Sequence, residues 1–313
     1  MFFVRKNILL LLVIGAIEFC SAQSSAVPGV FTRLGFGARA MGMSNAMAGV
    51  RSGELSGFYN PAVVPFAVGR TASIGTSFMS LDRHLNSLFY SQPIDTNAGI
   101  AVGILNSGVS NIDGRDADGF HTENYSTSEN LFMLSFGLKI RKITIGITPK
   151  LYYSSLFSKF SAKTLGFDFG ILYPFNRHLS FGLVIKDVRA EYKWDSSVLY
   201  DVQGNTTNEK FLLRKILGAS YLLDDLGLVS AEIETNSLTT IVRLGAEALL
   251  LESLTVRAGI DGWDLHDSQR AHPSFGISFD TGYTTYSPVI NYAFVVEPYG
   301  LFAEHVLSLS VKL

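Results

Sequence analysis

The sequence predicts an all-β protein, a 14-stranded antiparallel transmembrane β-barrel with a short N-terminal helical plug. Three observations lead to this fold class. The chain opens with the layout of an export signal. It is 47% hydrophobic and 17% charged, yet after the signal it lacks a run of about eighteen apolar residues that could form a membrane-spanning helix. From Thr71 onward, short stretches alternate between apolar and small or polar residues. Because a bilayer admits only helices and closed barrels, such an exported chain is expected to form a barrel.

Residues 1–22 are the predicted signal peptide. They begin with basic residues, continue with the apolar run ILLLLVIGAI and end at a small-residue site, so we expect cleavage between Ala22 and Gln23. A lipoprotein anchor at Cys20 is the alternative, which the bulky Glu18 two residues earlier disfavours. Removal of this one cysteine would leave no disulfide, thiol nucleophile or thiolate metal ligand in the mature chain.

Charge and motifs exclude several function classes. The 25 basic and 27 acidic residues give a formal net charge of -2, which is neither a nucleic-acid footprint nor an acidic tail. The six histidines show no paired metal spacing, and no nucleophile elbow, phosphate-binding loop or dinucleotide fingerprint is present. We therefore predict neither an enzyme nor a cofactor. A hydrolase with a serine and a histidine on neighbouring strands is the open alternative.

The strands are read from their alternation. In KITIGITPKLYY, apolar side chains fall on odd positions such as Ile143 and Ile145, and small or polar ones on even positions such as Thr144. A soluble sandwich also alternates, but here glycine, serine and threonine dominate the second face, as expected for the inside of a barrel. The even number of strands would return both ends to one side. The predicted strands are 71–79, 85–92, 96–105, 129–140, 142–153, 163–173, 178–187, 211–222, 226–235, 239–250, 253–262, 272–281, 284–296 and 304–313.

The connections support this arrangement, since short turns alternate along the chain with longer polar loops, as in outer-membrane barrels. The final stretch AEHVLSLSVKL alternates up to Leu313 and resembles the closing strand that the barrel-assembly machinery recognises. Together these features assign residues 70–313 to the barrel.

A set of charged residues falls on the glycine- and serine-rich face of the predicted strands. We expect them to be solvated or mutually paired residues of the inner wall, with a substrate-binding role as the alternative. This polar wall comprises Asp168, Lys186, Glu232, Arg243, Glu247, Arg257 and Asp261, and Glu234 and Asp280 fall on the same face.

The segment between the signal and the barrel, residues 23–69, is unlike the strands. It contains LGFGARAMGMSNAMAGVRSGELSGFYNPAVV, in which glycine and alanine would let backbones approach closely inside a lumen. Asn60 before Pro61 favours a turn that feeds the first strand. We predict a helical plug, with a flexible leader as the alternative. Its motif residues are Gly37, Ala38, Arg39, Gly42, Asn60, Pro61 and Ala62.

The two parts of this motif, in this order, resemble the N-terminal signature of FadL-like (long-chain fatty-acid transporter) barrels and, more closely, of the PorV/PorQ group of outer-membrane proteins. The resemblance implies a type IX secretion system component in the outer membrane of a Gram-negative bacterium, which docks or translocates secreted protein cargo with other secretion-system subunits. The alternative that it implies is a FadL-like transporter of hydrophobic compounds such as fatty acids and aromatic hydrocarbons. A scaffold barrel without transport is a third possibility. In each case outer-membrane lipid is an expected partner and nucleic acid is not.

The stretch NIDGRDADGF places Asp113, Asp116 and Asp118 among glycines, loosely like a calcium loop. The spacing does not match the EF-hand pattern and lacks its closing glutamate. An aspartate- and glycine-rich turn is therefore expected, with a bound cation as the alternative.

Overall fold

The computed structural model describes residues 27–54, 57–157, 160–197, 204–264, 271–282, 288–297 and 303–313. The predicted signal peptide, with its cleavage site between Ala22 and Gln23, lies outside the described residues.

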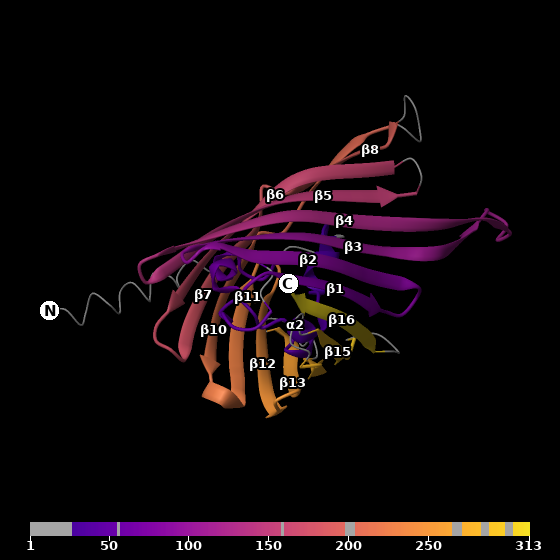
Figure 1. Ribbon diagram of the computed structural model, residues 1–313. Helices are drawn as coiled ribbons and strands as arrows, with labels where there is room; N and C mark the ends of the chain where they lie inside the picture. The colour runs from indigo at the N-terminus through magenta and orange to yellow at the C-terminus, as the bar shows by residue number, and fades with distance from the viewer. Residues whose placement is uncertain are drawn as a thin grey trace.

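The architecture is a closed antiparallel barrel of 14 strands, which confirms the predicted fold class (Figure 1). Each strand pairs with its neighbours in sequence, except that β7 pairs with β10 and that β1 closes the barrel against β16. The wall strands are β1 (Thr71–Phe78), β2 (Arg83–Asp95), β3 (Ala98–Arg115), β4 (His121–Ile140), β5 (Ile143–Leu156), β6 (Phe160–Pro174), β7 (Leu179–Val188), β10 (Arg214–Leu222), β11 (Gly227–Thr235), β12 (Thr240–Leu251), β13 (Leu254–Asp264), β14 (His272–Asp280), β15 (Val289–Val295) and β16 (Glu304–Lys312).

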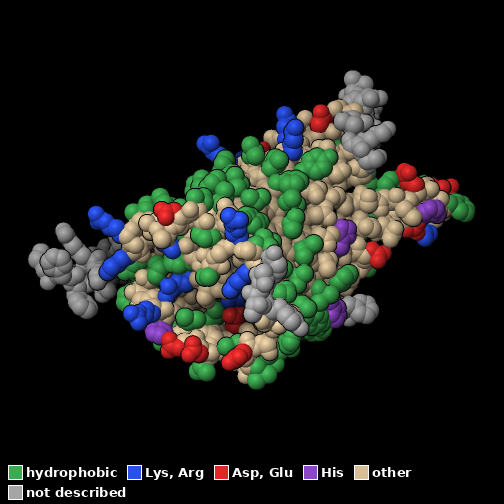
Figure 2. Space-filling view, viewed as in Figure 1, with side chains coloured by type: hydrophobic (Ala, Val, Ile, Leu, Met, Phe, Trp, Pro, Cys, Tyr) green, Lys and Arg blue, Asp and Glu red, His purple; other side chains and the backbone are tan. Residues whose placement is uncertain are grey.

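The alternation read from the sequence separates an outer from an inner face. On β5, Ile143 and Ile145 are 45% and 42% exposed, whereas Thr144 between them is 2% exposed. Large apolar side chains are exposed in this way on every wall strand, and in Figure 2 they cover the strands around β4 to β6. A continuous outward band of this kind is what a lipid-facing wall requires.

The N-terminal segment lies inside the barrel, and its described part, residues 27–54 and 57–69, is called the plug below (Figure 1). It contains three short helices, η1 (Val30–Arg33), α2 (Ala38–Gly42) and η2 (Pro61–Phe66). Helices α2 and η2 contact opposite parts of the wall, α2 against β13 to β16 and η2 against β2 to β6. No helix in the described part of the chain is long and apolar enough to cross a membrane.

The inner face is not small and polar everywhere, which corrects the expectation from the sequence. Toward the loop between β3 and β4, inward positions carry buried large side chains, including Phe89, Leu105 and Leu131. They pack with plug aromatics such as Phe36, whose ring lies 3.9 Å from that of Phe89. The plug supplies an apolar surface there, so the wall facing it is apolar too.

Two hairpins extend beyond the wall at the same end of the barrel, which we call the hairpin end; the opposite end, with the C-terminus, is the terminal end (Figure 1). The β3–β4 ladder runs on past the last pair with β2, at Val109, to a pair between Arg115 and His121. The second hairpin, β8 (Glu191–Asp195) with β9 (Thr206–Lys210), lies within a stretch that the sequence predicts as a loop. A short helix, η4 (Asp224–Leu226), forms the β10–β11 turn at the terminal end.

Candidate functional site: the plug and its polar wall

A belt of inward-facing glycines forms the seat of the plug. A Cβ atom built on Gly146 would lie 2.5 Å from the nitrogen of Ala62, and one on Gly182 would lie 2.5 Å from the carbonyl carbon of Ala48. Direct cross-strand pairing lines several of these glycines up across neighbouring strands. Only glycine admits such close approach of plug backbone to wall backbone. The glycine seat comprises Gly99, Gly137, Gly146, Gly170, Gly182, Gly218, Gly245, Gly259 and Gly276.

The first part of the plug motif is fastened to β12 and β16. The Arg39 guanidinium donates to both carboxylate oxygens of Glu247, at 2.9 and 3.1 Å, and to the carbonyl of Ser52 at 2.9 Å. Burial alone would lower the pKa of Arg39, but the Glu247 carboxylate outweighs it and raises that pKa above its ordinary value. Ala38 donates its backbone N–H to Ser308 Oγ at 3.2 Å. Gly42 approaches so closely that its own Cβ would lie 3.0 Å from Gly276 Cα. Gly37, whose φ is 75°, starts helix α2.

The second part of the motif is fastened to β6. Asn60 caps η2 by accepting a hydrogen bond from the backbone N–H of Ala62 at 2.9 Å. Its Nδ2 donates to the carbonyls of Ala48 at 2.8 Å and of Ile171 at 3.3 Å, so one side chain joins the plug to itself and to the wall. Pro61 opens η2 against the glycine seat, and Ala62 is fully buried.

Tyr59 holds the two parts of the motif together. Its hydroxyl lies 3.0 Å from both the backbone nitrogen and the carbonyl oxygen of Phe36, and 2.8 Å from Asn45 Oδ1. Burial raises the pKa of Tyr59 far above its ordinary value, so the phenol stays protonated and able to donate.

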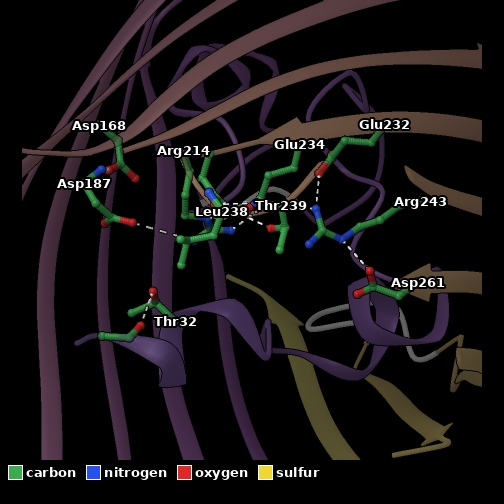
Figure 3. Close-up of polar contacts among 12 residues, drawn as sticks. Thr32, Asp168, Asp187, Arg214, Glu232, Glu234, Leu238, Thr239, Arg243 and Asp261 are labelled. Atoms are coloured by element: carbon green, nitrogen blue, oxygen red, sulfur yellow. Dashed lines mark hydrogen bonds and ion pairs between the residues drawn. The ribbon is translucent and has the colours of Figure 1, made fainter. Parts of the chain in front are cut away.

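Charged residues of the wall form a paired network beside the plug, shown in Figure 3. The Arg243 guanidinium lies between three carboxylates, at 3.1 Å from Glu232, 2.8 Å from Glu234 and 2.8 Å from Asp261. Arg214 donates to Glu234 at 2.7 Å. Glu232 also accepts the backbone N–H of Ala48 at 3.0 Å, which ties the network to the plug. Buried charges of this kind are tolerated because each is paired and hydrogen-bonded.

The network continues toward β5. Lys150 pairs with Asp168 at 2.6 Å and with Asp187 at 3.1 Å, and Tyr152 donates to Asp187 at 2.5 Å. Asp187 lies 3.7 Å from Arg214, which links the two halves. The ammonium of Lys186 lies 4.4 Å from the centroid of the Phe58 ring, in a cation–π contact with the plug.

Arg257 on β13 binds the same carboxylate as Arg39. It donates to Glu247 at 2.6 Å, so this carboxylate is shared between a plug arginine and a wall arginine. Arg257 also donates to Ser278, which in turn donates to Asn291. All seven polar-wall residues predicted from the sequence therefore belong to paired or ring contacts around the plug.

The sequence did not single out Lys150, Asp187 and Arg214, which complete this network. Lys150 occupies an inner position in the alternating pattern, so it could have been included in the predicted polar wall. Asp187 could not, because alternation from Lys186 places it on the outer face. Its φ of 64° turns the chain so that both residues are buried.

The plug separates two vestibules. At the hairpin end, a cavity of about 660 Å³ has plug residues Leu34 and Met41 at its inner limit and is also lined by Ile241 and Val295. At the terminal end, a cavity of about 600 Å³ is lined by the Arg39 and Glu247 pair among mostly polar residues. Between them, the interior of the plug holds a void of about 30 Å³.

The aspartate-rich stretch forms a turn at the tip of the β3–β4 hairpin. Asp116 Oδ1 accepts the backbone N–H groups of Asp118 and Phe120, at 3.0 and 2.9 Å. Asp113 pairs instead with Arg115 and His121, each at 2.6 Å. Among the described residues no group of three or more acidic, histidine or cysteine side chains could hold a metal ion.

Comparison with known proteins identifies the fold. No protein-family model matches the chain, and no curated protein matches it significantly. Among solved structures, it is similar to the Ralstonia pickettii toluene transporter TbuX, with a TM-score of 0.66, 13% identity and coverage of 90% of this chain and 100% of that one. Its fold is that of a FadL-like barrel. The Pseudomonas putida toluene transporter TodX aligns at TM-score 0.63 and 15% identity, over 90% and 99% of the two chains. A Pseudomonas aeruginosa FadL homologue aligns at TM-score 0.63 and 11% identity, over 88% and 97%.

At these identities the likeness concerns the FadL-like fold alone. It supports the broader half of the resemblance found in the sequence, whereas membership of the PorV/PorQ group stays a prediction.

Proposed function

We propose that this FadL-like barrel resides in the outer membrane of a Gram-negative bacterium and carries hydrophobic compounds from the hairpin-end vestibule toward the terminal end. The observation that carries the proposal is the vestibule of about 660 Å³, which ends on the plug and combines apolar lining such as Met41 and Ile241 with charged residues such as Arg83 and Glu297. A site of this volume, which brings apolar side chains and polar groups together, can bind small organic ligands. The solved structures of the same fold are described as toluene transporters and a monoaromatic hydrocarbon channel.

Transport through the lumen requires the plug to rearrange. Its internal void of about 30 Å³ has room for about two water molecules and no organic compound. Arg39 and Glu54 line both this void and the terminal-end vestibule. Ala40 also lines the void, and the next residue in the chain, Met41, lines the hairpin-end vestibule. A route through this void would pass next to the Arg39–Glu247 pair, and release of this pair would then be part of opening.

Uptake by cells tests this function. Cells that produce the barrel should accumulate radiolabelled toluene or lauric acid faster than cells in which the gene is deleted. Ile241→Asp replaces part of the apolar lining by a carboxylate opposite Glu234 and should lower uptake about tenfold or more, because an apolar ligand offers no hydrogen bond to the buried charge. Leu226→Asp is the matched control, since Leu226 is 70% exposed in the β10–β11 turn. Equal uptake by the Ile241→Asp variant, the control and the unmodified barrel would contradict the proposal.

The second candidate is docking of secreted protein cargo, as a type IX secretion component of the PorV/PorQ kind would do. It is favoured by the β3–β4 ladder, which extends beyond its neighbouring strands and carries Phe120 71% exposed at its tip. Such a two-stranded ribbon offers free strand edges and an apolar anchor to a protein partner. The purified barrel should then retain secreted proteins that bear the type IX sorting domain, and Phe120→Asp should weaken retention. Uptake of small molecules without any cargo retention would exclude this candidate.

A further inference from the structure

The outer wall carries an apolar groove at the closure of the barrel. It has a volume of about 630 Å³ and is lined from the outside by side chains of β1, β2, β3, β15 and β16. No charged residue lines it. Figure 2 shows hydrophobic side chains over the part of the wall where Figure 1 places β1 and β16. Its apolar lining comprises Ile74, Leu88, Ile104, Ile290, Leu307 and Leu309.

The groove lies where inward-facing side chains are small. Gly75 stands opposite Ser87 on β2 and Ser308 on β16, and all three residues line the groove from its deep side. Behind them lies the small Ala38 of the plug, whose N–H binds Ser308. Ala38 belongs to helix α2, which contacts β16, so the plug backs these small wall residues.

The groove is not an opening into the lumen. Pairing is continuous from Thr71 to Phe78 on both sides of β1, and β2 pairs without a break from Arg83 to Pro93 with β3. A molecule can therefore enter the groove only from the side of the membrane.

A polar row crosses the wall at the hairpin-end limit of the groove. Thr76 Oγ1 donates to Asn86 Oδ1 at 2.8 Å, and Asn106, opposite Asn86, donates to Asn130 at 2.8 Å. Within the described part of the chain the amide nitrogen of Asn86 has no hydrogen-bond acceptor. This exposed amide provides unused donors directly beside the apolar groove.

We infer that the groove binds one glycerophospholipid, with an acyl chain along Leu88 and Leu307 and an ester carbonyl at the Asn86 amide. The inference rests on the membrane location proposed above. An outward apolar groove in a closed wall meets acyl chains before any other molecule, and an ester carbonyl is the acceptor next to such a chain. The lining has no lysine or arginine to pair with a phosphate, so the match is with an acyl chain and its ester and not with a phosphate-rich headgroup such as that of lipopolysaccharide.

Native mass spectrometry of the full chain, purified in mild detergent, tests this inference. With 1-palmitoyl-2-oleoyl-phosphatidylethanolamine as the probe, the unmodified barrel should retain one lipid more firmly than any further copies. Leu88→Trp fills the groove and should weaken retention about tenfold or more. Asn86→Leu removes the donor and should weaken it about two- to tenfold. Ile145→Trp is the matched control, because Ile145 is an equally outward residue, 42% exposed, away from the groove.

Folding of each variant is checked by its heat-dependent migration in gels, and Leu307→Trp replaces Leu88→Trp should the latter not fold. Equal retention by the groove variants and the control would overturn the inference, as would displacement of the phospholipid by lipopolysaccharide. Extraction of the folded chain without any amphiphile would instead contradict the membrane location itself. The two failures are therefore distinguishable.

Discussion

Replacement of a single seat glycine by alanine should release the plug while leaving the barrel intact. Gly170 on β6 is the sharpest position, because a Cβ there would lie 2.8 Å from Pro61 Cδ and closer still to Asn60 Oδ1. Asn60 is fully buried and makes three hydrogen bonds, which its displacement would break. Gly166, four residues earlier on the same strand, provides the control. Its Cβ would lie 3.1 Å from the Ala190 side chain and 3.2 Å from that of Tyr152, and the nearest backbone atom, Val188 O, would be 3.8 Å away.

The expected magnitude follows from these contacts. Overpacking costs about 1 to 3 kcal/mol, and three hydrogen bonds at about 1 kcal/mol each add about 3 kcal/mol when they are lost. Since part of this is recovered by relaxation, we expect Gly170→Ala to destabilise plug docking by about 4 kcal/mol. Gly166→Ala should cost less than about 1 kcal/mol. Because both variants remove the same backbone freedom, the difference between their effects reports the contacts of Gly170 with Asn60 and Pro61.

A shift of about 4 kcal/mol raises the undocked fraction by about three orders of magnitude. Ion conductance across planar lipid bilayers measures this directly: openings should be frequent for Gly170→Ala and rare for Gly166→Ala. Trypsin should also cleave within the plug of the first variant only. If both variants conduct and are cleaved alike, the plug does not depend on close backbone contact with this glycine.

Three further predictions concern other parts of the molecule. Arg39→Met should lower the free energy of unfolding of the barrel by about 1.5 to 3 kcal/mol, because the hydrogen bonds to the Glu247 carboxylate are lost while Glu247 stays paired with Arg257. Arg39→Lys should retain part of this stabilisation, and thermal unfolding in detergent compares the two variants. Leu183 lies on the outer face of β7 and is 42% exposed, and Leu183→Arg should lower the free energy of unfolding in lipid vesicles by about 2 to 4 kcal/mol. Leu226→Arg at the terminal end should be nearly neutral. Equal effects of the two substitutions in a urea titration would argue against a lipid-facing wall. Calorimetric titration with calcium should give no binding heat, since Asp113 is already paired with Arg115 and His121; a binding isotherm would restore the cation site.

The wall could be predicted because each strand records its two faces locally. The inner and outer positions of a strand follow from neighbouring residues alone, as in Ile143, Thr144 and Ile145. The hairpin β8–β9 was missed because its strands contain only five residues each and lie in a polar loop. Short elements of this kind depend on tertiary packing, here the stacking of Trp194 on Phe160 at 4.9 Å.

The contacts of the candidate site could be predicted only in part. Alternation identified Glu247 and Arg243 as inner-wall residues, but not their partners, because the Arg39–Glu247 pair joins residues 208 positions apart. The glycine face indicated a small-residue interior and did not reveal that plug backbone rests on it. Asp187 was not predicted because its left-handed backbone conformation changes the face on which the side chain lies, and an alternating pattern does not reveal such a change.

The wide separation of the plug contacts constrains the order of assembly. Ala38 precedes the first strand, yet its bonding partner Ser308 lies on the last one, and β1 meets β16 along the same line. This N-terminal segment therefore cannot complete its docking until the last strand has reached the barrel. Pairing of β1 with β16 and docking of the plug then become a single late event. The large sequence separation of these contacts predicts that this step limits the rate of folding.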